Sequence, residues 1–94
     1  MIRVLVTYHC KPGQREAFLD SLVSSGLAQK CREDEGNIQY EYYRSVDRED
    51  ELFLYEKWED AEALTGHIGQ PHMKEIGACK EKFVEDTEIV KIEE

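Results

Sequence analysis

The chain has 94 residues, which predicts one domain, residues 1–94, with a small hydrophobic core. Hydrophobic residues make up 40% of it, and no apolar run approaches the roughly 18 residues of a membrane span, so we expect a cytoplasmic protein with no membrane partner. A net charge of −9 repels phosphate backbones and argues against a nucleic-acid partner. The three cysteines include no CxxC pair, which disfavours a disulfide framework and a zinc ribbon.

The first half of the chain predicts a strand, a helix and a second strand. Residues 2–8 are rich in β-branched side chains, as in a strand. Apolar residues recur at helical spacing from 14 to about 32 and predict one continuous helix. Gly26 lies inside that helix, where it either permits close packing on a sheet or leaves room for a ligand. Gly36 is suited to a left-handed cap, and 38–44 predict the second strand.

A hairpin and a further helix are expected next. The short polar segment 45–50 predicts a hairpin loop, which leads into a third strand at 51–58. Asp60 is suited to the N-cap of a helix that runs to about residue 68.

The last part of the chain predicts another helix and a final strand. Pro71 occupies a first helical position, and the helix is expected to continue to about residue 84. Residues 87–92 then predict a strand. The order β-α-β-β-α-β predicts a ferredoxin-like α+β fold, an antiparallel sheet with helices on one face.

Two of the predicted strands are apolar on both faces. The runs are Val4-Leu5-Val6 and Leu52-Phe53-Leu54-Tyr55. An antiparallel sheet with one wetted face should instead alternate apolar and polar residues. We therefore expect a second copy of the chain to cover the free face, which predicts a homodimer packed sheet against sheet.

Two histidines, His67 and His72, flank Pro71 and allow several interpretations. Their spacing misses the i, i+4 pattern of one helical face, so no dedicated metal site is expected. They can pack in the core, since His72 precedes Ile76 by one helical turn. The first turn after Pro71 can also bind an anion together with Lys74. Finally, histidine is the commonest side chain for proton transfer near neutral pH.

Aromatic residues gather on two neighbouring predicted strands. Glu56 and Trp58 share one face of the third strand, and Tyr40 and Tyr42 share a face of the second. Aromatic walls with a few polar groups are typical of a pocket for a small, flat organic molecule. They are equally typical of a core in which the hydroxyl groups are hydrogen-bonded.

Several segments resemble the antibiotic biosynthesis monooxygenase family over essentially the whole chain. They are "KPGQREAFL", "EDEGNIQYEYYRS", "LFLYEKWEDAEALTGHIGQPHMK" and the final strand. The most specific part is E-x-W-x-D-x-x-A-L-x-x-H-x-x-x-P-H-x-K, from Glu56 to Lys74. The resemblance implies a ferredoxin-like fold that forms a dimeric α+β barrel, in agreement with the strand pattern.

The resemblance also implies an activity. Members of this family oxidise aromatic polyketides or quinols with molecular oxygen and without flavin, haem or metal. This implies a cofactor-independent monooxygenase in which His67 or His72 is the base. The motif and the aromatic pattern together indicate these substrate-binding residues: Tyr40, Glu56, Trp58 and Lys74.

Other activities occur in the same family and stay open as alternatives. One branch is an isomerase or lyase type that processes a small phosphorylated carbonyl signal molecule. Haem-degrading members use an asparagine on the first strand with a tryptophan and a histidine, and residues 2–9 contain no asparagine. A third alternative is a non-catalytic small-ligand-binding domain that keeps the fold without the chemistry.

Overall fold

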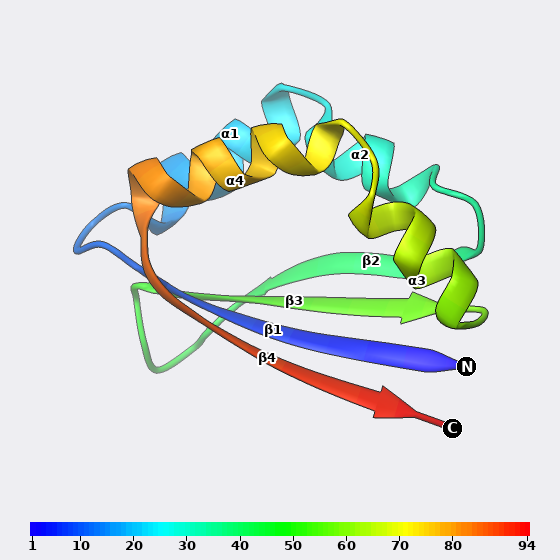
Figure 1. The fold of residues 1–94 in the computed structure, drawn as a ribbon. Helices are drawn as coiled ribbons and strands as arrows, with labels where there is room; N and C mark the ends of the chain where they lie inside the picture. Colours follow the sequence, from blue (N-terminus) through cyan, green and yellow to red (C-terminus); the bar gives the residue numbers. More distant parts are fainter.

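The computed structural model describes residues 1–94 and confirms the predicted ferredoxin-like α+β fold. Helices form one layer over a four-stranded antiparallel sheet (Figure 1). None of the helices has the length and hydropathy to span a membrane. The elements in chain order are β1 (Ile2–Cys10), α1 (Arg15–Ser24), α2 (Leu27–Arg32), β2 (Asn37–Arg44), β3 (Glu51–Trp58), α3 (Ala61–Ile68), α4 (His72–Phe83) and β4 (Val84–Glu93).

The strand register brings four distant residues into one row. The strand order is β2-β3-β1-β4, with each neighbouring pair antiparallel. Val4 lies opposite Glu56 on one side and Lys91 on the other, and Glu56 lies opposite Tyr40. Residues directly opposite one another point to the same face of a sheet. This row therefore faces the helices from all four strands.

The helix predicted as continuous from 14 to 32 is interrupted, and that prediction was wrong. α1 ends at Ser24, and Gly26 has φ +82° at the start of α2. Left-handed backbone is readily adopted by glycine because it has no Cβ. A Cβ at Gly26 would meet no atom within 4 Å. Glycine is therefore favoured here by its backbone conformation, and no close packing contact requires it.

The hydrophobic core lies between the helices and the covered face of the sheet. Alternate residues of β1 and β3 point into it, as the strand period requires. Its largest fully buried side chains come from both layers: Trp58, Phe18, Leu22, Leu52, Leu54 and Cys31.

The opposite face of the sheet has no helix over it (Figure 1). Leu5, Phe53 and Tyr55 lie on this face and are half-buried. Val90 lies opposite Leu5 and is 54% exposed. This side of the sheet is therefore apolar as well, as the sequence pattern predicts.

Candidate active site

A cavity of about 360 Å³ lies between the sheet and helices α3 and α4. Most of its walls are apolar side chains from both layers. Such a cavity, with a few convergent polar groups, is typical of sites for small organic molecules. Its lining residues with polar side-chain atoms are Tyr8, Tyr40, Glu56, His67, Lys80, Thr87 and Lys91.

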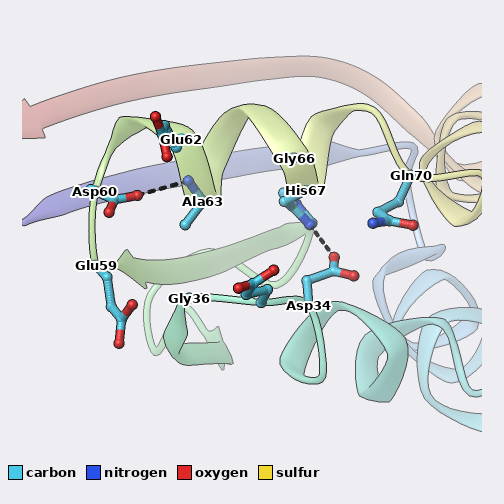
Figure 2. Close-up of a pocket in the computed structure, with 10 residues that line it drawn as sticks. Asp34, Gly36, Glu59, Asp60, Glu62, Ala63, Gly66, His67 and Gln70 are labelled. Atoms are coloured by element: carbon cyan, nitrogen blue, oxygen red, sulfur yellow. Dashed lines mark hydrogen bonds and ion pairs between the residues drawn. The ribbon is translucent and has the colours of Figure 1, made fainter.

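His67 stands in this wall, in the last turn of α3. The helix begins where the Asp60 side chain accepts a hydrogen bond from the Ala63 backbone N–H, which confirms the predicted N-cap. The His67 ring lies against the Trp58 indole, with 4.5 Å between ring centroids, and it is 3% exposed. Figure 2 shows the ring pointing toward Asp34.

Asp34 holds both histidines, and the sequence did not indicate this residue. His67 Nδ1 lies 2.7 Å from Asp34 Oδ2, and His72 Nε2 lies 2.9 Å from the same oxygen. A carboxylate oxygen accepts hydrogen bonds, so both ring nitrogens donate. Asp34 follows α2 and is 33 residues from His67 in sequence. Nothing local sets it apart among the 21 aspartates and glutamates of the chain.

Glu56 is a buried carboxyl group in the same cavity. Burial raises the pKa of Glu56 from 4.5 to about 7, although a hydrogen bond from the Trp58 indole N–H opposes the shift. That bond is 3.0 Å long, and Glu56 is 6% exposed. A carboxyl group with a pKa near neutrality can change its protonation state during a reaction at physiological pH.

The tautomer of His67 leaves one nitrogen free. Burial lowers the pKa of His67, with Asp34 acting in the opposite direction, so the ring is neutral near pH 7. Because Nδ1 donates to Asp34, the lone pair of the neutral ring is on Nε2. Nε2 lies 3.8 Å from Glu56 Oε1, longer than a hydrogen bond. The arrangement can accept a proton at Nε2 and hold the resulting positive charge between two carboxyl groups.

The structure separates the predicted site residues into two groups. Tyr40, Glu56 and His67 line the cavity together. Trp58 is fully buried behind His67, and His72 lies on the other side of Asp34; neither lines the cavity. The cavity between sheet and helices thus contains one of the two histidines, and the ring of this histidine lies against Trp58.

Lys74 is exposed and lines neither this cavity nor the hollow beside it. In the same turn, the backbone N–H groups of Met73 and Lys74 already donate to Gln70 and Pro71 carbonyl oxygens at 3.1 and 3.2 Å. Fewer free N–H groups remain for an anion than at an uncapped helix start. No observation therefore favours the phosphate site considered for this turn.

A second hollow of about 280 Å³ lies on the Asp34 side of His67 (Figure 2). His67 borders both spaces. Anionic ligands are repelled here because the lining carries five carboxyl groups, from Asp34, Glu35, Glu59, Asp60 and Glu62. The apolar cavity is therefore the better candidate site for an organic anion.

Asp34 and three neighbouring side chains have the composition of a metal site. Donor atoms of Cys31, Asp34, His67 and His72 lie within 4.8 Å of one another. One Asp34 oxygen accepts hydrogen bonds from both histidines, and burial raises the pKa of the Cys31 thiol to about 11. Hydrogen bonds join Asp34 and the two histidines into a buried network, and the absence of a cofactor stays a prediction.

Comparison with known proteins identifies the family. The family model described as antibiotic biosynthesis monooxygenase matches residues 1–78, and the chain belongs to this family. A Bacillus subtilis (strain 168) relative named "Putative monooxygenase YcnE" is 33% identical over 84 residues, 88% of this chain and 86% of the relative. The predicted family resemblance is thereby confirmed.

Solved structures share the fold of this chain. A conserved protein from Methanosarcina mazei Go1 is 29% identical, with a TM-score of 0.88 over 99% of this chain and 91% of that chain. PA3566 from Pseudomonas aeruginosa is 22% identical, with a TM-score of 0.86 over 99% of this chain and 92% of that chain. At that lower identity the likeness concerns the fold alone.

Proposed function

We propose that the protein is a monooxygenase that oxidises a small aromatic or quinol substrate with molecular oxygen and without a cofactor. Family membership supports the reaction type. The observation that carries the proposal is His67, held by Asp34 at Nδ1 while its Nε2 is free beside Glu56 in an apolar cavity. A positioned base in a largely apolar cavity suits such a reaction.

The reaction begins with proton transfer from the substrate hydroxyl to His67 Nε2. The imidazolium formed is stabilised by Asp34 at Nδ1 and by Glu56 near Nε2. The substrate anion then passes one electron to oxygen, and the two radicals combine to form a carbon–oxygen bond. The O–O bond of the peroxide breaks, and water leaves with the hydrogen of that ring carbon. A hydroquinone and oxygen thus become a hydroxyquinone and water, with all four electrons supplied by the substrate.

Oxygen uptake with a panel of quinols tests this proposal. Autoxidation of a quinol also consumes oxygen, but it yields the unhydroxylated quinone and hydrogen peroxide. The enzyme should instead form a hydroxyquinone without stoichiometric peroxide, after treatment of the protein with a chelator. Uptake that never exceeds the protein-free rate for any quinol would leave a non-catalytic binding domain as the better description.

The pH dependence of kcat/KM should show the ionisation of Glu56. This group is protonated below about pH 7 and ionised above it, because burial raises its pKa to about 7. Ionised Glu56 stabilises the imidazolium, so kcat/KM should rise with pH through about 7. Glu56→Gln should remove this rise, as measured with one quinol between pH 5.5 and 9. If the variant keeps the same rise, another group is responsible.

The stability of the same variant provides an independent readout. A carboxyl group whose pKa is raised in the folded state stabilises the fold below its unfolded pKa and loses this contribution as the pH rises through the folded pKa. For Glu56 the window extends from 4.5 to about 7. Urea unfolding should therefore show Glu56→Gln gaining stability relative to wild type as the pH increases across this range.

We also propose that the chain forms a homodimer through the uncovered face of the sheet, with Leu5, Phe53 and Tyr55 in the interface. Sedimentation at micromolar concentration should give about 22 kDa, twice the 11.0 kDa of the chain. Phe53→Glu should produce a monomer, because it places a charge in an apolar interface. Val46→Glu is the matched control, since Val46 is 100% exposed in the hairpin loop. A wild-type monomer at this concentration contradicts the proposal.

A further inference from the structure

The candidate cavity carries its polar groups at two separate ends. Glu56 and Lys91 lie opposite Val4 of β1, and Thr87 lies opposite Tyr8. The Lys80 ammonium is 5.8 Å from the centre of the Tyr8 ring. Four residues along a strand span about 13 Å. Lys80 therefore marks the end of the cavity away from Glu56, and since His67 approaches Glu56, the proton acceptors form the other end.

Lys80 is a cation without an anionic partner in an acidic protein, and its ammonium lies over the Tyr8 ring. It is half-buried in the cavity wall, and its ammonium forms no ion pair or hydrogen bond within the chain, although acidic residues outnumber basic ones by 21 to 12. Lys91, at the other end, is paired with Glu93 at 3.2 Å. An unpaired ammonium beside low-dielectric walls attracts an anion more strongly than a lysine in water does.

The space between the two ends is apolar. Val6 and Ile89 face each other across β1 and β4, and Ile76 and Met73 of α4 lie over them in the cavity lining. Burial raises the pKa of Tyr8 well above its ordinary value, so its hydroxyl stays protonated and adds no negative charge near Lys80. A ligand that fits this lining has an apolar middle and a negative group at one end.

We propose that the site binds an elongated aromatic anion. Its carboxylate or other anionic group lies at Lys80, its rings lie between Val6 and Ile76, and its hydroxyl lies at Glu56 and His67. The placement of the hydroxyl rests on the proposed function, whereas the recognition of the anion does not. About 360 Å³ is at the small end for ligand pockets, which suits a molecule of about two rings.

The test compares two probes of nearly the same shape, 6-hydroxy-2-naphthoate, which is an anion, and its neutral carboxamide. Affinities are measured by fluorescence titration without oxygen, so that no turnover occurs. Wild type should bind the naphthoate more tightly than the carboxamide. Lys80→Gln should weaken naphthoate binding by roughly 10- to 100-fold, the effect of losing a hydrogen bond between charged groups, and should change carboxamide binding little.

Matched variants separate a binding role from a structural one. A lysine in the last turn of a helix also interacts with the helix dipole, so Lys80→Gln can lower the melting temperature on its own. Lys80→Arg keeps the charge and should keep the preference for the anion. Lys74→Gln removes one positive charge from the exposed part of the same helix and should leave both affinities unchanged.

Several outcomes overturn the proposal. They are equal affinity of wild type for both probes, binding of neither, or equal weakening of naphthoate binding by Lys80→Gln and Lys74→Gln. Its failure is distinguishable from failure of the proposed function. If quinols are oxidised while the anion is not preferred, only this inference falls. If Lys80-dependent anion binding occurs and no quinol is oxidised, the monooxygenase proposal falls and the anion site stands.

Discussion

Replacing His67 with alanine should lower turnover of a quinol substrate by roughly 10²–10⁴-fold, the usual contribution of a positioned proton-transfer group. His67 is the one histidine that lines the candidate cavity, and Asp34 fixes its tautomer so that Nε2 accepts the proton. Initial rates per folded molecule, measured at saturating substrate, report this loss. Circular dichroism and urea unfolding establish how much of the variant is folded.

His72→Ala is the matched control for this prediction. It also removes a donor to Asp34 Oδ2, but His72 does not line the cavity. We expect a much smaller loss of turnover than in His67→Ala. A histidine that only packs would instead cost stability, roughly 1–3 kcal/mol when a buried partner is left unpaired, with turnover per folded molecule unchanged. If neither variant loses turnover, the pair is structural and the acid–base assignment is wrong.

Gly36→Ala should be among the most destabilising single substitutions in the chain. Gly36 has φ +83°, and a Cβ placed there would lie 2.3 Å from the Cβ of Ala63 in α3. Left-handed backbone costs roughly 1–2 kcal/mol in a residue with a side chain, and forcing extra volume into a packed site costs roughly 1–3 kcal/mol more. The free energy of unfolding should therefore fall by about 2–5 kcal/mol, as measured by urea titration.

Gly13→Ala isolates the backbone part of this effect. Gly13 has φ +74°, but a Cβ there meets no atom within 4 Å. The free energy of unfolding of Gly13→Ala should fall by about 1–2 kcal/mol, from backbone strain alone. The difference between the two losses of stability measures the close contact between Gly36 and α3. This contact packs α3, which carries His67, against the segment that carries Asp34. Equal losses in both variants would mean that this close contact has no energetic weight.

The order of strands and helices was predictable because each element carries a local pattern. Alternation along β1 and β3 and helical spacing in α1 and α4 arise within ten or so residues. The break at Gly26 was not predictable in this way, since buried apolar residues continue at helical spacing on both sides of it. The left-handed backbone of Gly26 alone divides the predicted helix into α1 and α2.

The part of the site that lies within the family motif was predictable from the sequence. Glu56, Trp58 and His67 belong to one motif, and they lie together in the structure. Asp34 was not predictable, because its contacts with the histidines span 33 and 38 residues and depend on how α2 ends relative to α3 and α4.

Lys74 and Lys80 show that the side of α4 on which a lysine lies decides whether it reaches the cavity. Lys74 belongs to the matching motif, yet it is exposed and lines no cavity. Met73, Ile76 and Lys80 are three and four residues apart in sequence and share the cavity-facing side of α4. This spacing could have pointed to Lys80, but only after the side of the helix that faces the sheet was known.

The most direct test of the proposed reaction is isotope labelling with ¹⁸O₂. Protein freed of metal and flavin is incubated with a quinol under labelled oxygen, and the product is analysed by mass spectrometry, with His67→Ala in parallel. We expect one labelled oxygen atom in the product of the wild type and little product from the variant. Product that carries no label, or that forms equally without protein, would contradict monooxygenation by this site.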